Sequence, residues 1–527
     1  MPADGGGLTV LFRLEDLKQR LPSLQSAVAT PSVVLGAACL LLHLIVNNRY
    51  GVFRDELYFI VCGQHLAWGY VDQPPLAPLI AAASHAVFGT ALEPLRLAPA
   101  LAMSATVALT AEFARILGGG RFAQWLCGLA VFFAPVFLVD GLILTTDFLQ
   151  PLTWLGCSWC LVRLAKTKDE RWWLAFGVIV GVSMESKYLI CFYMLGLTVG
   201  VLATPLRASL RRPWLYIGAA LAVVLAAPSL YWQFEHGWPF LELGAAGLNG
   251  KNVPLSALAF FGQELVFPGP IAAPIWLAGL WGFSARPPEP QYRAFAIAYV
   301  VIFAVLVALH GKPYYLTPIY PTLFAGGAVA IERWLASRVF RQLAVGGLVV
   351  SGALVAPFAL PILPPSHFRD YAHTLGIQTY SQGTERETTG LLPQQLADMF
   401  GWREMAAAVA VAYQSLPPAE RAKAVFFGGN YGEAAAVDVY GPALHGPPVI
   451  SSNNNYYLWG PKGYDGSVVI ALGGDHDRLS KEFRSIQVVG EIRSPYAMPY
   501  ESNIPIYILR DPRAPLSSFW PSLKHYE

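Results

Sequence analysis

Eleven long apolar stretches constrain the fold of this chain more than any other feature. A helix needs about 20 apolar residues to cross the roughly 30 Å hydrocarbon core of a bilayer. The stretches are residues 31–47, 92–116, 123–140, 147–164, 172–186, 188–204, 214–231, 267–283, 294–309, 315–332 and 343–360. Only 13% of the 527 residues are charged, whereas soluble domains carry about 25%. The sequence therefore predicts a polytopic α-helical membrane protein with about eleven, and at most thirteen, transmembrane helices.

The chain divides into three predicted parts. The first apolar stretch begins at residue 31, and charged residues become more frequent after residue 360. Residues 1–30 are expected to form a cytoplasmic N-terminal segment, and residues 31–360 the transmembrane domain. Residues 361–527 are expected to form a separate soluble domain. Its β-like runs are residues 424–427, 449–451, 467–472, 486–489 and 504–509, and its helical patterns are residues 393–415 and 430–440. Strands interleaved with helices predict a small α/β domain.

The distribution of basic residues predicts the orientation in the membrane. Cytoplasmic loops carry an excess of Lys and Arg, and a cytoplasmic N-terminus puts 17 of these residues on the inside and 6 on the outside. With eleven spans, the C-terminal domain then lies on the outer face. The same arrangement collects acids in outer loops and at span ends, and carboxylates beside a bilayer are usually kept for function. A net charge of +2 without a basic stripe predicts no nucleic-acid partner.

The first outer loop, residues 48–91, holds the most informative motif. Asp55 and Glu56 lie just after the first apolar stretch, and a Gly-Tyr-Val-Asp-Gln-Pro-Pro-Leu element follows at residues 69–76. The apolar run 76–88 is too short to cross a bilayer comfortably and is expected to lie along the interface. An acid pair is also favoured at the start of any helix by the macrodipole. A purely structural role for Asp55 and Glu56 is therefore the alternative.

This loop resembles that of the GT-C glycosyltransferases, and within them the family of dolichyl-phosphate-mannose–protein mannosyltransferases and bacterial lipid A aminoarabinose transferases. Similar elements follow along the chain. They are residues 145–147, the turn with Gly177, Gly181 and Lys187, residues 233–240, residues 310–321 and, in the C-terminal domain, residues 430–435 and 452–459. One position departs from the pattern, because Gln73 stands where aminoarabinose-type members often have a Lys that is thought to hold the lipid phosphate.

The resemblance implies a glycosyltransferase that takes a sugar from a polyprenyl-phosphate donor in a bacterial inner membrane. The acceptor would be a hydroxyl or phosphate group of a glycolipid, glycan or protein on the periplasmic face. Asp55 is the expected base or acceptor-orienting carboxylate, and general-base help is worth about 10²–10⁴-fold in rate. Glu56 and Asp147 are the other catalytic candidates.

The resemblance also implies where the substrates bind. Cations are expected beside the leaving polyprenyl phosphate, because they stabilise the charge that develops there. The candidates are Lys312, Lys187 and Arg96. The expected substrate-binding residues are Asp72, Gln73, His310, Tyr314, Tyr315 and Tyr320.

Several of these residues have simpler explanations. Asp72 could only organise the turn before the two prolines that follow it. Basic residues at span ends commonly extend to lipid headgroups, and interfacial tyrosines are common in membrane proteins. Residues 453–455, which are all Asn, and Trp459 could recognise an acceptor, but a polar loop with one packed indole is the preferred interpretation.

Two other functions compete with glycosyl transfer. A transporter or flippase of a lipid-linked or polar substrate would favour inverted repeats and charged residues at mid-membrane, and the sequence shows no clear repeat. A receptor or scaffold would act mainly through the C-terminal domain. Metal use stays open: the outer-side histidines lack ligand spacing, while paired acids could hold a divalent cation beside a phosphate.

Overall fold

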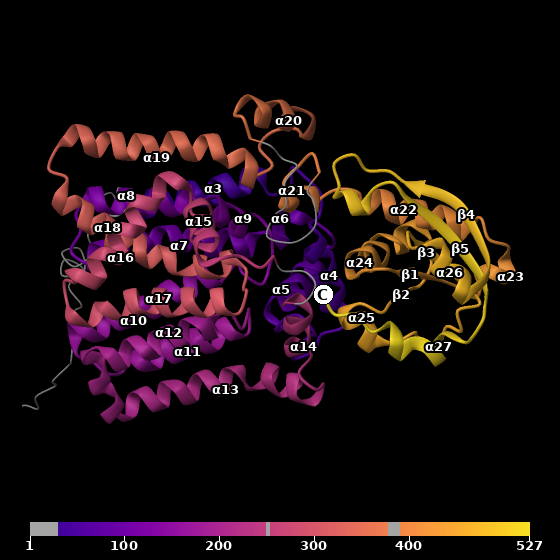
Figure 1. Cartoon of the computed structure of the whole chain (residues 1–527), viewed down its shortest axis with the longest axis horizontal. Helices are drawn as coiled ribbons and strands as arrows, with labels where there is room; N and C mark the ends of the chain where they lie inside the picture. Colours follow the sequence, from indigo (N-terminus) through magenta and orange to yellow (C-terminus); the bar gives the residue numbers. More distant parts are fainter. Residues whose placement is uncertain (1–29, 249–252, 378–389) are drawn as a thin grey trace, which may run out of the picture.

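The computed structural model describes residues 30–248, 253–377 and 390–527. The helices of the first part run side by side along the long axis of the molecule, and a smaller part built on a β-sheet lies at one end (Figure 1). The expected cytoplasmic segment, apart from Thr30, lies outside the described residues. The described architecture is therefore a helical body with a C-terminal α/β part.

Each of the eleven apolar stretches contains a helix or a pair of helices. The bounds are α3 (Pro31–Val46), α7 (Leu97–Ile116), α8 (Arg121–Phe132) with α9 (Pro135–Leu142), α10 (Gln150–Thr167), α11 (Trp172–Met184), α12 (Ile190–Ala203), α13 (Pro213–Glu235), α16 (Ala273–Ala285), α17 (Arg293–Ala308), α18 (Tyr320–Trp334) and α19 (Arg338–Ala359). By length and hydropathy, four of the described helices are suited to cross a bilayer, or up to seven spans form if each bent pair counts once. A membrane fold is thus supported, and eleven spans stay a prediction.

The bends between paired helices coincide with prolines. Helix α8 meets α9 at 65°, α12 meets η1 (Pro205–Arg211) at 97°, and α15 (Ala257–Val266) meets η3 (Pro270–Ala272) and α16 at 99°. Pro135, Pro205 and Pro270 each start the second helix of a pair. Proline has no N–H to donate and is well tolerated in the first turn of a helix, but not in its interior. An apolar run that reads as one span can therefore bend at these points.

Glycines bring the helices of the body into backbone contact. A Cβ atom on Gly177 of α11 would lie 2.0 Å from the carbonyl oxygen of Gly218 on α13. A Cβ atom on Gly279 of α16 would lie equally close, at 2.0 Å, to the carbonyl oxygen of Leu323 on α18. Small residues are enriched at transmembrane helix interfaces because they allow such close approach. The glycine at 177 therefore has a packing role.

The first outer loop forms short helices between α3 and α7. They are α4 (Arg54–Gln64), α5 (Leu76–Phe88) and α6 (Leu92–Leu95). Helix α5 has 13 residues, fewer than a helix needs to cross a bilayer. Its Leu79, Val87 and Phe88 side chains are exposed. A short apolar helix with exposed apolar side chains suits the expected place along the membrane interface.

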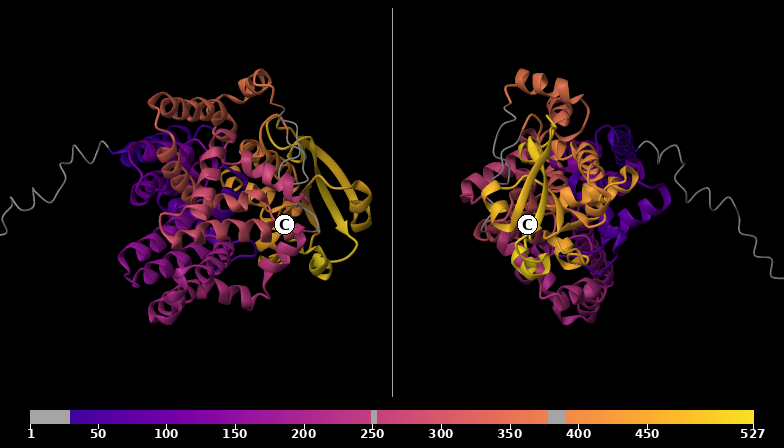
Figure 2. Two further views of the ribbon diagram at one scale, coloured as in Figure 1. Left: turned by 60° about the vertical axis from the view of Figure 1, so that its left-hand side comes forward. Right: turned by 90° about the vertical axis from the view of Figure 1, so that its right-hand side faces the viewer.

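All five β-like runs of the C-terminal part are strands of one sheet. They are β1 (Ala424–Gly428), β2 (Val449–Ser451), β3 (Val468–Leu472), β4 (Phe483–Ile492) and β5 (Ile504–Pro512), in the order β2-β1-β3-β5-β4. Strands β1, β2 and β3 are parallel, and β5 is antiparallel to β3 and β4. The long pair β4 and β5 lies on the side away from the helical body (Figure 2).

One face of the sheet shares its core with the first outer loop. Helices α22 (Trp402–Gln414) and α24 (Tyr431–Tyr440) cover this face, and their apolar residues form one cluster with Leu57, Tyr58 and Val61 of α4. The other face packs against α27 (Leu516–Phe519) and η8 (Trp520–Leu523). Apolar burial of this kind is a large favourable term. The C-terminal part is therefore docked on α4 and is not merely tethered to the last helix of the body.

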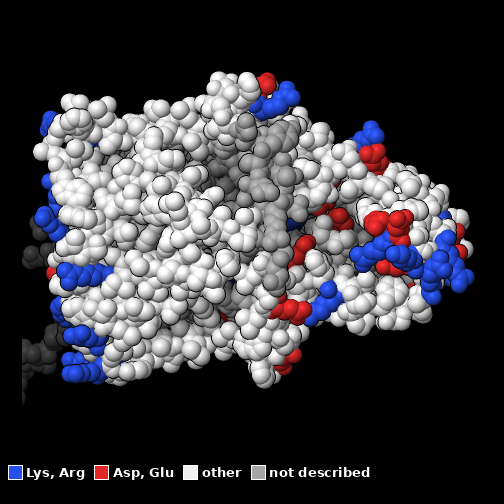
Figure 3. All heavy atoms as spheres, viewed as in Figure 1, with Lys and Arg blue, Asp and Glu red and all other residues white. Residues whose placement is uncertain are grey.

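Surface charge is concentrated at the two ends of the molecule. In the view of Figure 3, Lys and Arg gather at the end of the helical body opposite the C-terminal part, and the flank between is almost uncharged. An uncharged flank of this kind suits contact with lipid. This distribution agrees with the predicted orientation, which stays a prediction.

Candidate functional site

Helix α4 presents Asp55 in its first turn. The carboxylate of Glu56 accepts a hydrogen bond from the backbone N–H of Phe53 (2.9 Å), which satisfies a donor at the start of the helix. The N–H of Arg54 donates to the carbonyl of Asp398 in the C-terminal part (3.1 Å). The beginning of α4 is therefore held from both sides, and Asp55 lies between these two anchors.

Glu56 and Arg96 form a fully buried ion pair beneath Asp55. Arg96 donates through Nε to Oε1 (2.9 Å) and through Nη2 to Oε2 (2.7 Å) of Glu56. Its other bonds go to the carbonyls of Asn47 (2.5 Å) and Gly51 (2.9 Å). Both side chains have zero exposure. The geometry favours a structural role for this pair over the catalytic and phosphate-binding roles expected from the sequence.

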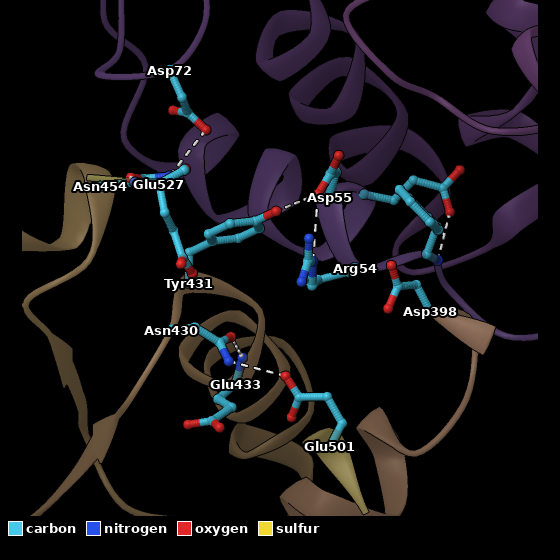
Figure 4. Close-up of polar contacts among 12 residues, drawn as sticks. Arg54, Asp55, Asp72, Asp398, Asn430, Tyr431, Glu433, Asn454, Glu501 and Glu527 are labelled. Atoms are coloured by element: carbon cyan, nitrogen blue, oxygen red, sulfur yellow. Dashed lines mark hydrogen bonds and ion pairs between the residues drawn. The ribbon is translucent and has the colours of Figure 1, made fainter. Parts of the chain in front are cut away.

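The carboxylate of Asp55 is contacted by the C-terminal part. The hydroxyl of Tyr431, in the first turn of α24, donates to Oδ1 at 2.7 Å, and Nε of Arg54 lies 3.9 Å from the same oxygen (Figure 4). The Asp55 side chain is 32% exposed, so it remains accessible from outside. Asp55 thus lies at the junction of the two parts of the molecule.

Asp72 is a second carboxylate at this junction. It accepts hydrogen bonds from Tyr58 (3.3 Å) and from Nδ2 of Asn454 (3.3 Å). Burial raises the pKa of Asp72 to about 7, and the negative charge of Asp55 adds to the rise. We call Asp55, Asp72, Tyr58, Tyr431 and Asn454 the junction site. Two neighbouring acids in different surroundings can divide the roles of base and proton carrier.

Lys187 is the centre of a second cluster. Its ammonium lies 2.7 Å from Asp147 and 4.9 Å from the ring centre of Tyr315. Tyr314 lies between Lys187 and Lys312, at 6.0 Å and 5.9 Å from the two ammonium groups. These distances are typical of cation–π contacts. The structure therefore brings together five of the residues singled out in the sequence, which we call the Lys187 cluster.

A backbone hydrogen bond links the elements that carry the two clusters. The N–H of Leu76, at the end of the Asp72 turn, donates to the carbonyl of Glu185 (3.0 Å), two residues before Lys187. The hydroxyl of Ser186 donates to the carbonyl of Thr146 (2.8 Å), next to Asp147. The junction site and the Lys187 cluster are thus borne by adjoining turns.

The structure gives three other predicted residues different surroundings. Gln73 is buried, and its amide points to the Cys62 sulfur at 3.7 Å. Tyr320 is buried in the helical body, where its hydroxyl donates to Glu264 (2.5 Å). His310 is exposed and has a φ of 48° in the turn before Lys312. Burial of Gln73 and Tyr320 favours packing roles over the substrate binding expected for them.

Tyr431 was not predicted as a site residue, and Asn454 was considered only among residues 453–455, for which a polar loop was the preferred interpretation. Both lie in motifs noted as similar to bacterial relatives, at residues 430–435 and 452–459, and that similarity was the available signal. Asn455 also joins the C-terminal part to the first outer loop, because its Oδ1 accepts a hydrogen bond from the backbone N–H of Val71 (2.6 Å). The Trp459 ring packs against the rings of His65 and Tyr456, with ring centres 4.6 Å and 4.9 Å away. These contacts agree with a packed indole at Trp459, whereas Asn454 belongs to the junction site.

The described residues give no positive indication of a metal centre. No group of three or more His, Cys, Asp or Glu side chains is arranged to hold an ion within residues 30–248, 253–377 and 390–527. Metal use therefore stays open, as it was from the sequence.

Known proteins share both sequence and fold with this chain. Residues 72–232 match the family described as dolichyl-phosphate-mannose-protein mannosyltransferase. The lipid A galacturonosyltransferase RgtD of Rhizobium johnstonii is 25% identical over 263 residues, which are 47% of this chain and 52% of that protein. The chain thus matches about half the length of this curated relative.

Two solved structures of ArnT from Cupriavidus metallidurans have the same fold. The apo structure superposes with a TM-score of 0.63 at 18% identity, and the structure bound to undecaprenyl phosphate with 0.60 at 15%. Each alignment covers 90% of this chain and 97% of that protein. The resemblance to the GT-C glycosyltransferases predicted from the motifs is confirmed.

Proposed function

We propose that this chain, a relative of the ArnT-type GT-C glycosyltransferases, transfers a sugar from a polyprenyl-phosphate donor to an acceptor at the outer face of a bacterial inner membrane. The family match and the shared fold support a membrane glycosyltransferase. Undecaprenyl phosphate in one ArnT structure supports a polyprenyl-phosphate donor. The name of the curated relative supports lipid A, or another glycolipid, as the acceptor class.

The observation that carries the proposal is the partly exposed carboxylate of Asp55 at the junction site. An ionised carboxylate only accepts hydrogen bonds, so it can orient an acceptor hydroxyl and take its proton as the oxygen attacks the sugar. For an acceptor phosphate, the carboxylate would accept a hydrogen bond only from a phosphate oxygen that carries a proton. Asp55 is one-third exposed, whereas its neighbour Glu56 is sealed beneath it by Arg96. The catalytic role therefore falls to Asp55.

The Lys187 cluster is the proposed site of the donor phosphate. Lys187 and Asp147 are both mostly buried, at 18% and 21% side-chain exposure, and charges act more strongly where water is excluded. Fixed cations stabilise the charge that develops on a leaving phosphate. Asp147 would orient Lys187, and Lys312 adds a second positive charge across Tyr314. Since Gln73 is uncharged and buried, this cluster replaces the Lys absent at position 73.

The test is Asp55→Asn in a strain deleted for the gene, with lipids and glycans read by mass spectrometry. The wild-type chain should restore a sugar-modified product. Asp55→Asn should lower its rate of formation about 10²–10⁴-fold, while expression and binding of undecaprenyl phosphate persist. Asp370→Asn is a matched control, because this exposed acid of α20 (Pro365–Thr374) forms an ion pair with the neighbouring Arg369 at 3.6 Å and is not part of the junction site.

Two results would contradict the proposal. Full activity of Asp55→Asn would remove Asp55 from the chemistry. Accumulation of substrate by proteoliposomes without a covalent product would instead indicate a transporter or flippase.

A further inference from the structure

The contact between Asp55 and Tyr431 joins residues that lie 376 positions apart in the sequence. The hydroxyl of Tyr431 donates to Oδ1 at 2.7 Å, which is an ordinary distance for an O–H···O hydrogen bond. Burial holds the pKa of Tyr431 well above its usual value, so the phenol remains a donor at neutral pH. The C-terminal part thus supplies a permanent hydrogen-bond donor to the carboxylate.

The ring of Tyr431 is fixed on several sides. The ring of Tyr58 lies 4.9 Å away, and the guanidinium of Arg54 lies 5.0 Å from the Tyr431 ring centre. The backbone N–H of Tyr431 donates to Oδ1 of Asn453 (2.9 Å). A side chain with its ring and backbone fixed in this way has little freedom to turn its hydroxyl away from Asp55.

The residue after Tyr431 shows how closely the two helices approach. A Cβ atom on Gly432 would lie 2.6 Å from Cγ of Arg54 and 3.1 Å from the ring of Trp402. Only a residue without a side chain lets α24 lie this close to α4. The local sequence Tyr431-Gly432 therefore combines the donor with the space that the donor needs.

The contacts also define which oxygen of Asp55 is available. Within the described part of the chain, the two polar contacts of this carboxylate both end on Oδ1. Because the side chain is one-third exposed, Oδ2 is the oxygen that can meet an incoming acceptor hydroxyl.

We propose that Tyr431 is a positioning residue, which fixes the Asp55 carboxylate through Oδ1 so that Oδ2 faces the acceptor. The inference rests on the proposed function of Asp55. It means that the C-terminal part completes the catalytic geometry and is more than a cover over the membrane domain. Tyr431 itself neither touches the reacting atoms nor changes its protonation state during transfer.

The test compares Tyr431→Phe with Tyr456→Phe in the full chain reconstituted with undecaprenyl-phosphate sugar and the acceptor lipid found by mass spectrometry. Both variants lose the hydroxyl of a buried tyrosine that packs beside Tyr58 and donates to a carboxylate, since Tyr456 donates to Asp438 (2.9 Å). Tyr431→Phe should lower kcat about 10- to 100-fold, the range for losing one hydrogen bond to a charged group, with KM within about twofold. Tyr456→Phe should retain the wild-type kcat.

The outcomes separate positioning from packing. A general loosening of the junction would lower the melting temperature and change kcat in both variants alike, which would overturn the inference. Wild-type kcat for Tyr431→Phe, with Asp55→Asn inactive, would overturn the inference and leave the proposed function standing. Activity retained by Asp55→Asn would instead overturn the proposed function itself.

Discussion

Replacing Glu56 by Gln tests the buried ion pair directly. Glu56 accepts four hydrogen bonds, from the N–H groups of Phe53 and Leu144 and from Nε and Nη2 of Arg96. Gln keeps one accepting oxygen but turns an NH₂ group toward donors that the other oxygen had satisfied. The substitution also leaves the charge of Arg96 unpaired at zero exposure.

The size of the effect follows from these contacts. About two buried donors lose their acceptor, and each unsatisfied group costs about 1–3 kcal/mol. Removing one partner of a buried ion pair costs about 3–5 kcal/mol in general, so the two estimates agree. We expect the free energy of unfolding to fall by about 3–5 kcal/mol for Glu56→Gln. Combining it with Arg96→Met should cost about 2 kcal/mol less than the sum of the single changes, because the two residues are coupled.

The assay is unfolding by sodium dodecyl sulfate in mixed micelles, followed by tryptophan fluorescence. A Glu56→Gln variant that unfolds at the wild-type detergent fraction would refute this reasoning. Loss of transferase activity without loss of stability would go further, because it would place Glu56 in contact with the substrate, as the sequence alone suggested.

Two further predictions concern the donor site and the pH. Lys187→Met should raise KM for the polyprenyl-phosphate donor at least about tenfold in a transferase assay, because it removes a mostly buried charge beside the proposed phosphate position. An unchanged KM for the donor would contradict the assignment of this cluster to the phosphate. Burial raises the pKa values of Asp72 and Glu433 to about 7, so between about pH 4 and pH 7 these two carboxyls hold more protons in the folded chain than in the unfolded chain. The melting temperature should therefore fall as the pH rises from 5 to 8, and this slope should be smaller in Glu433→Gln; equal slopes in the two proteins would show that Glu433 is not responsible.

Much of the fold followed from local patterns in the sequence. Apolar runs located the helices of the body, and β-branched runs located the five strands of the sheet. The bends were missed because Pro135 and Pro270 lie within or beside continuous apolar sequence, where hydropathy does not change. The order of the strands could not be predicted from the sequence either, since the pairing of β3 with β5 depends on contacts between residues that are distant in the chain.

The site was predictable only in part, for a similar reason. Resemblance and chain position pointed to Asp55, and the order of motifs pointed to Lys187, Asp147 and Tyr315. Arg96 was expected to face the outer surface, but folding places it against Glu56, forty residues earlier in the chain. No local pattern reports such a pairing, nor the contact of Tyr431 with Asp55.

The docking of the C-terminal part on α4 also sets an order of events during biosynthesis. Tyr431 and Asn454 are translated long after Asp55 and Asp72, their partners in the first outer loop. The ribosome must therefore add 376 residues after Asp55 before the contact with Tyr431 can form. During insertion into the membrane, the acids of the first loop are without these partners, and the assembled junction appears only when the last part of the chain has folded against them.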